Sequence, residues 1–337
     1  MKMGLDMELN VDRNYYFDNL KFMLITLVVI GHIIEPLIGS YVNVKLIYSF
    51  IYSFHMPLFV FISGYFCKNI NENEKTFSKI NNILIPYIIF QLLYSLFNIY
   101  VLKGQSAKIT FVYPYWITWY LLSLFMWILI LPYFSKIKYS IVIAIFISIL
   151  SGYDNNIGYY LSLSRTITFF PYFLIGYFCS QSHINIIKKY IRKKYAILAL
   201  IIIVCLIYFI NDDFDYKWFY GSFSYSQLST PIYPKFIMRI FTYMLAIITS
   251  VFVLALIPKC KLFFTKLGSR TTSVYALHGF IVKLLVKYDF FSYINSFTSK
   301  ILIIIFSFFI VLVLSSKSIN TATKKILHPK VLSQMGR

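Results

Sequence analysis

The sequence predicts an all-α polytopic membrane helix bundle of about ten transmembrane helices with both termini cytoplasmic. Hydrophobic residues make up 59% of its 337 residues, charged residues only 13%, and the mean hydropathy is +0.71. A soluble domain carries about 25% charged residues. Apolar stretches close to the ~20 residues that cross a bilayer recur along the chain, and Lys and Arg gather in alternate loops. These observations exclude a soluble globular protein and a disordered one.

Ten apolar segments follow one another, and each is expected to be helical because backbone polar groups in lipid must bond within their own segment. The first is interpreted as a retained span, because no small-residue cleavage site follows it. The fifth and seventh are short. The predicted spans are Leu20–Ile38, Leu46–Phe66, Ile83–Leu102, Trp116–Tyr133, Tyr139–Gly152, Tyr159–Cys179, Tyr195–Ile210, Phe236–Ile257, Thr271–Lys287 and Ile301–Lys317.

The distribution of positive charge predicts the orientation of the bundle. Loops that would lie on one side of the membrane hold 20 Lys and Arg, and those on the other side hold 6. Because Lys and Arg favour the cytoplasmic side, both termini are expected there. This organisation gives a cytoplasmic N-terminal segment at 1–19, a membrane domain at 20–317 and a basic cytoplasmic tail at 318–337. Trp116 and Trp119 are expected as aromatic residues at the outer interface.

The remaining composition points away from other kinds of site. The net charge is +20, but it is explained by the loop asymmetry, so no nucleic-acid partner is expected. The four cysteines form no CxxC pair, and no Cys/His cluster has the spacing of metal ligands. No metal and no bound cofactor are therefore expected.

Ionisable residues form a stripe on the first predicted span. Lys21 and His32 are eleven residues apart, which brings them to one helix face about 16 Å from each other along the axis. Asp18 lies three residues before Lys21, and Glu35 three residues after His32. Because charged groups in a span are costly, such a stripe indicates the wall of a path with a cation at its mouth and a proton acceptor inside. The alternative is a buried histidine that bonds a neighbouring helix.

The second span contributes His55 and Ser63. His55 is expected at a depth similar to that of His32. It is interpreted either as a substrate-positioning residue or as a packing histidine that bonds the backbone carbonyl freed by Pro57. Ser63 and Gly64 indicate either a contact with substrate or close helix packing.

Two further ionisable residues lie in the sixth and ninth spans. Arg165 needs a partner or water, because an arginine is not easily neutralised. It is predicted either to hold an anionic or hydroxyl-rich ligand or to form an ion pair with Glu35. His278 is a weaker candidate for positioning the substrate, as are Trp119 and Tyr120.

Several motifs occur in the order found in one known family. The stretches are DNLKxxxxxxxxxGH at 18–32, FHMPLFVFISGYF at 54–66, ILIPYIIFQ at 83–91, TWYLLSLFMW at 118–127, RTITFFPYFLIGYF at 165–178 and SVYALHG at 273–279. Together they resemble the integral-membrane acyltransferase-3 family, in particular its fucose 4-O-acetylase-like branch of capsular and exopolysaccharide O-acetyltransferases. The family carries an arginine eleven residues before the first-span histidine, where this chain has Lys21, which keeps the charge but loses the planar fork.

The resemblance implies transfer of an acetyl group from cytoplasmic acetyl-CoA, a co-substrate, to a hydroxyl of a polysaccharide or its lipid-linked precursor. A sugar hydroxyl needs a base at neutral pH, and histidine is the usual one. His32 is the candidate base or transient acyl carrier, and Glu35 would fix its tautomer. Lys21 and Asp18 are the candidates for binding the CoA donor.

Two other functions are compatible with the residues. A glycan transporter or flippase would also use ten spans and aromatic-lined cavities. A succinyltransferase would need an extra cation near the donor, from Arg165 or Arg239. The expected location is the cell membrane of a bacterium, in contact with membrane lipid, and a homo-oligomer is compatible with it.

Overall fold

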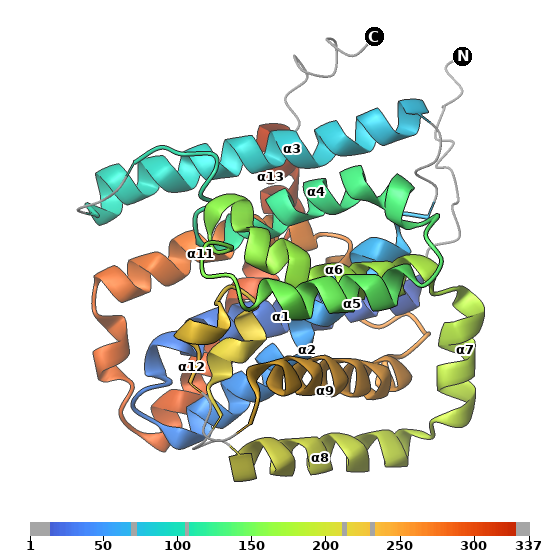
Figure 1. Cartoon of the computed structure of the whole chain (residues 1–337). Helices are drawn as coiled ribbons and strands as arrows, with labels where there is room; N and C mark the ends of the chain where they lie inside the picture. Colours follow the sequence, from blue (N-terminus) through green and yellow to red (C-terminus); the bar gives the residue numbers. More distant parts are fainter. Residues whose placement is uncertain (1–13, 69–72, 105–107, 211–213, 230–232, 328–337) are drawn as a thin grey trace, which may run out of the picture.

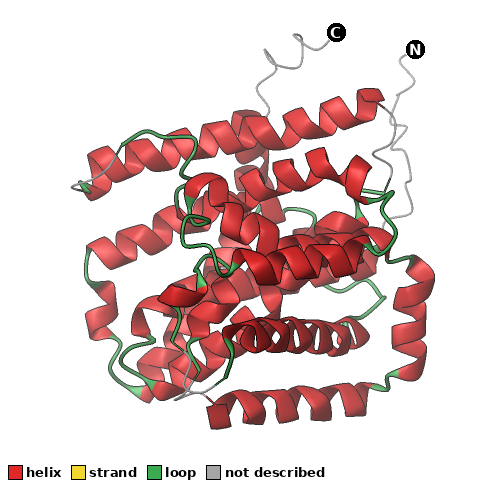
Figure 2. Cartoon of the chain, in the orientation of Figure 1, coloured by secondary structure: helices red, strands yellow, loops and turns green. Residues whose placement is uncertain are grey.

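The computed structural model describes residues 14–68, 73–104, 108–210, 214–229 and 233–327. Within these ranges the chain is helices and loops, with no strand (Figure 2). The α-helices are α1 (Tyr15–Ile34), α2 (Val42–Tyr65), α3 (Asn73–Leu96), α4 (Trp119–Phe134), α5 (Ser140–Ser151), α6 (Leu163–Phe178), α7 (Gln181–Tyr190), α8 (Lys193–Ile210), α9 (Lys235–Leu256), α10 (Thr265–Gly268), α11 (Thr271–Lys287), α12 (Phe297–Leu314) and α13 (Lys317–Leu327).

All ten predicted spans contain a helix. Seven helices of the described chain are long and apolar enough to cross a membrane, some of them together with a short adjoining turn. The other three, α5, α6 and α11, have 12, 16 and 17 residues. By length and composition, seven of the ten helices are therefore candidates for full spans, and the other three are shorter. The all-helical polytopic membrane bundle itself is confirmed.

Among the described residues, three α-helices lie outside the predicted spans: α7, α10 and α13. Amphipathic α7 crosses one end of the bundle, while most of the long helices run side by side (Figure 1). Helix α13 begins the segment predicted as a basic tail and packs against α3, α11 and α12. Most of the predicted N-terminal segment and the end of the tail, 1–13 and 328–337, lie outside the described residues.

The loops that the charge count assigns to one side of the membrane meet at one end of the bundle. At the predicted inner end, the Asn19 amide donates to the carbonyls of Pro258 and Cys260, both at 3.0 Å. At the opposite end, the hydroxyl of Tyr41 donates to the Ile294 carbonyl at 3.0 Å. The alternation of the loops is thus present in the fold. Which end faces the cytoplasm stays a prediction from the charges.

Helices α1 and α2 form the centre of the bundle. Helix α1 packs against α2, α10, α11 and α12, and α2 packs most extensively against α6. Within the 18-residue apolar window of each helix, 56% is buried for α1 and 67% for α2. The corresponding share for α8 is 17%. Most polar residues of α1 and α2 therefore lie inside the protein, except Asn43 at the start of α2, whereas α8 presents most of its surface outward.

Two glycines allow α2 and α6 to touch backbone to backbone. A Cβ at Gly64 would collide with the carbonyl oxygen of Phe173, and a Cβ at Gly176 would collide with that of Phe61. Small residues allow close approach of membrane helices. The packing interpretation of Gly64 is thus correct.

We predict that Gly64→Ala destabilises the protein by about 1–3 kcal/mol, because the added methyl forces the two backbones apart. Thermal and denaturant unfolding of the full chain in nanodiscs would measure the loss. Gly39→Ala is the matched control, since a Cβ at Gly39 has no atom within 4 Å. Equal stability of the two variants would contradict a tight α2–α6 contact.

Candidate active site

Two cavities meet at His32. The inner one, of about 450 Å³, extends from His32 to Lys21 near the predicted inner end of the bundle. The outer one, of about 270 Å³, extends from His32 towards Tyr48 and Tyr220 at the opposite end. Four residues line both cavities: His32, Met56, Ile117 and Trp119. His32 therefore stands where a group from one side would meet a group from the other.

The wall of the inner cavity on α1 follows the predicted stripe. Lys21, Ile25, Val28 and His32 all line it, as their spacing along one helix face predicts. Asp18 is not part of the lining. It is buried behind the wall at 6% exposure and its carboxylate lies 2.9 Å from the ammonium of Lys21. Asp18 thus fixes the position of the cation.

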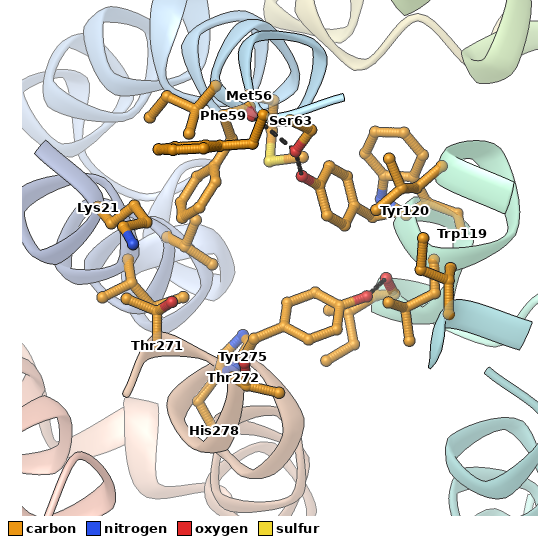
Figure 3. Close-up of a pocket in the computed structure, with 18 of the residues that line it drawn as sticks. Lys21, Met56, Phe59, Ser63, Trp119, Tyr120, Thr271, Thr272, Tyr275 and His278 are labelled. Atoms are coloured by element: carbon orange, nitrogen blue, oxygen red, sulfur yellow. Dashed lines mark hydrogen bonds between the residues drawn. The ribbon is translucent and has the colours of Figure 1, made fainter. Parts of the chain in front are cut away.

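The opposite wall of the inner cavity holds hydroxyls in a mainly apolar surface (Figure 3). The hydroxyls of Ser63 and Tyr120 lie 2.5 Å apart, and Ser63 also donates to the Phe59 carbonyl. Tyr275 donates to the carbonyl of Ile117 at 2.7 Å. Their protons are thus committed to the protein. The hydroxyls of Thr271 and Thr272 also line the cavity and have no hydrogen bond among the described residues. The rest of the surface is mainly apolar.

His32 has a defined environment on one ring nitrogen. Its Nδ1 lies 3.3 Å from a carboxylate oxygen of Glu35 and 3.3 Å from the hydroxyl of Tyr52. When Nδ1 carries the proton and donates to Glu35, Nε2 keeps a lone pair that can accept a proton. Trp116 packs edge-on against the imidazole at a centroid distance of 4.6 Å.

The two other candidate histidines are fixed by their own helices. The Nδ1–H of His55 donates to the Ile51 carbonyl and that of His278 to the Val274 carbonyl, both at 2.8 Å. His55 therefore bonds a backbone carbonyl other than that of Ser53, which Pro57 would free. It also lines the outer cavity.

His278 lies beside His32. It lines the inner cavity, and its ring stacks near that of His32 at a centroid distance of 5.5 Å. Its Nε2 is buried without a partner among the described residues. Since Nδ1 already carries the proton, this nitrogen is an acceptor that can support a donor placed beside His32.

The predicted Glu35–Arg165 ion pair is not formed. Both residues line the outer cavity, but Glu35 contacts His32, and Arg165 donates from Nε to the Tyr220 carbonyl at 3.4 Å. The guanidinium lies over the rings of Trp119 and Tyr159. The ion-pair alternative for Arg165 is thus wrong, and its contact with a ligand stays a prediction.

Three contact residues of the site were missed by sequence reasoning: Tyr52, Trp116 and Tyr220. Tyr52 lies three residues before His55, so the helical spacing carried a usable signal. Trp116 was predicted only as an interfacial aromatic, and Tyr220 lies in a 3-10 turn of an outer loop. The sequence gives no signal that Trp116 and Tyr220 reach the site, because loops lack the hydrophobic periodicity of a helix.

A buried glutamine of α3 holds the loop that carries Trp116 and Trp119. Gln91 is 1% exposed and all four of its side-chain hydrogen bonds are used. Its amide group donates twice and its carbonyl oxygen accepts twice, at 2.7–3.1 Å, with the partners Thr110, Tyr113, Tyr115 and Thr118. Trp116 sits inside this loop at φ +44°, a conformation that a bulky residue adopts only when its surroundings impose it.

The described residues contain no group of three or more His, Cys, Asp or Glu side chains that could hold a metal. His32 and Glu35 stay the predicted catalytic residues, and aromatic residues surround them.

Comparison with known proteins assigns the chain to a family. Residues 14–316 match the sequence model of the acyltransferase-3 family, described as an acyltransferase domain. The chain belongs to the acyltransferase-3 family. It is also similar to the nodulation protein NolL of Mesorhizobium japonicum, with 23% identity over 225 residues that cover 61% of this chain and 59% of that protein. The chain thus matches less than two thirds of that relative's length. No solved structure matches it.

Family membership and the helical bundle together make the chain a member of the acyltransferase-3 family with membrane-spanning helices. The predicted family and the predicted helical membrane bundle are confirmed. The roles of the individual site residues stay predictions, which their geometry supports to different degrees.

We predict that Gln91→Leu lowers the unfolding free energy by about 1–3 kcal/mol and shifts tryptophan fluorescence, because buried groups of the loop lose their partners. Gln91→Glu keeps both acceptor bonds but places an oxygen against the carbonyls of Thr110 and Tyr113, so it should be destabilising as well. Gln181→Leu, at the exposed end of the bundle, is the control. Unchanged tryptophan emission and unchanged stability in Gln91→Leu would show that the loop keeps its conformation without the hydrogen bonds of Gln91.

Proposed function

We propose that this acyltransferase moves an acetyl group from cytoplasmic acetyl-CoA to a hydroxyl of a capsular or exopolysaccharide, or of its lipid-linked precursor, in the cell membrane of a bacterium. It would then belong to the fucose 4-O-acetylase-like branch of the family. The observation that carries the proposal is the position of His32 between two cavities that extend towards opposite ends of the bundle.

The inner cavity suits the donor. Its volume of about 450 Å³ lies in the usual range of small-molecule sites. Lys21, at about 16 Å along α1 from His32, would attract the phosphates of CoA at the mouth. The apolar lining would accept the thioester arm, which brings the carbonyl carbon to His32.

The placement of the cations favours an acetyl over a succinyl donor. Lys21 is the one Lys or Arg among the described residues that line the inner cavity. Arg165 lines the outer cavity, and Arg239 lines neither of the two. A succinyl carboxylate near His32 would therefore meet no cation on the donor side.

The outer cavity suits a glycan acceptor. Trp116, Trp119, Tyr159 and Tyr220 present aromatic faces and edges, against which sugar rings pack, and Glu35 and Arg165 add polar contacts. A transporter would also use two facing cavities, but the family supports an acyltransferase. The acceptor hydroxyl would reach His32 from this side.

The reaction then needs one proton acceptor. Nε2 of His32 takes the proton from the sugar hydroxyl as its oxygen attacks the thioester carbonyl carbon. The carbon–sulfur bond breaks, and the imidazolium returns the proton to the departing thiolate, which leaves an ester and free CoA. Glu35 and Tyr52 orient the ring through Nδ1, and the carboxylate stabilises the imidazolium.

We predict that His32→Ala lowers acetyl transfer by at least about 10²-fold, since the hydroxyl loses its base. Label from acetyl-labelled CoA would be followed into ester-linked carbohydrate in membranes. His183→Ala, an exposed histidine of α7, is the control and should retain transfer. Equal label in wild type and His32→Ala would remove His32 from the chemistry. Glycan crossing the bilayer without any label would favour a transporter.

We predict that Lys21→Gln raises KM for acetyl-CoA about 10-fold with little change in kcat, because a charge-assisted contact to the donor is lost. Lys21→Arg should restore most of the affinity. Since Asp18 loses this cation in Lys21→Gln, D18N/K21Q separates the effect on the donor from that on the fold. An unchanged KM in both variants would place CoA elsewhere.

A further inference from the structure

Arg165 is clamped in the outer cavity by groups that fix its plane. Its guanidinium carbon lies 5.1 Å from the ring centroid of Trp119 and 5.3 Å from that of Tyr159. Its Nε donates to the backbone carbonyl of Tyr220 at 3.4 Å. Cation–π contacts and one hydrogen bond thus hold the fork in one orientation.

The two terminal amino groups of Arg165 have no hydrogen-bond partner among the described residues, and no described carboxylate lies within 4.0 Å of them. The nearby acidic residue of the cavity, Glu35, contacts His32 instead. A charge at this depth of a membrane bundle is costly unless it meets a partner or a water-filled cavity. The residue lines such a cavity.

A fixed guanidinium fork with free terminal N–H groups matches a carboxylate or a phosphate better than a hydroxyl, because two parallel N–H···O bonds to a planar or tetrahedral anion are geometrically favoured. Trp119 lines both the inner and the outer cavity, and its ring packs against the guanidinium of Arg165. An anionic group held there would lie in the same 270 Å³ space as His32.

We propose that the acceptor is an acidic glycan, whose carboxylate or phosphate binds Arg165 and thereby presents a hydroxyl of the same or the next sugar to His32. This inference rests on the proposed acyl transfer and names its acceptor class. The anionic group belongs either to an acidic sugar of the polymer or to the phosphate of a lipid-linked precursor. A fixed contact of this kind holds the acceptor hydroxyl near His32, and such positioning accelerates a reaction between two bound groups.

Binding is tested without turnover, on the full chain in nanodiscs, through quenching of tryptophan fluorescence. The probes are oligogalacturonate, the same oligomer reduced at its carboxyl groups, and galactose 1-phosphate. We expect at least one acidic probe to bind about 10-fold or more tightly than the neutral one, with the difference shrinking at high salt. Preference for the first acidic probe indicates a polymer sugar, and preference for the phosphate a lipid-linked acceptor.

Variants of Arg165 test whether this residue causes the tighter binding of the acidic probes. Arg165→Gln should abolish it and Arg165→Lys should keep only part, because an ammonium is a point charge without a fork. Lys108→Gln, an exposed lysine of an outer loop, should leave it unchanged. Equal binding of acidic and neutral probes by the wild type, which needs no variant, overturns the inference. So does a preference that survives in Arg165→Gln.

The outcome is separable from that of the proposed function. Acetyl transfer to glycan without any acidic preference would keep the O-acetyltransferase and reject the acidic acceptor. An acidic preference that depends on Arg165, without transfer from acetyl-CoA, would keep the anion site and reject the acetyl donor.

Discussion

The contact between α2 and α6 is the constraint on which the site depends. Because Gly64 and Gly176 have no side chain, the two backbones touch, and no other residue would fit at either crossing point. This contact sets how far Tyr52 and His55 of α2 lie from Arg165 of α6. All three line one cavity as a result. A wider crossing would separate the aromatic and cationic walls of that cavity.

The polar groups of the bundle are arranged so that few of them lack a partner in a medium that offers no water. Asp18 holds Lys21, Glu35 holds His32, and His55 and His278 bond the backbone of their own helices. At the site, one nitrogen of His32, Nε2 of His278 and the amino groups of Arg165 stay open. Elsewhere in the described chain, Nε of Arg239 and Oδ1 of Asn320 are buried without a partner. Unsatisfied polarity in a membrane protein is expensive, so its location is informative about function.

The outer loop at 108–118 shows a different way to build a site. No hydrophobic period places Trp116 against His32. Instead, one buried amide on α3 satisfies four groups of the loop, and the backbone of Trp116 takes a conformation it would not adopt alone. The ammonium of Lys283 on α11 lies 4.3 Å from the centroid of the Trp116 ring, so this lysine packs against the wall of the site.

The sequence by itself determined the features that depend on local spacing. Apolar length marked all ten helical segments, the alternation of charge grouped the loops by end, and the period of α1 placed Lys21 and His32 on one wall. The tertiary structure alone decided which helices meet. It brought Tyr52 and Trp116 to His32 and kept Arg165 apart from Glu35. These outcomes depend on distances between helices, which close packing fixes and which no spacing along one chain encodes.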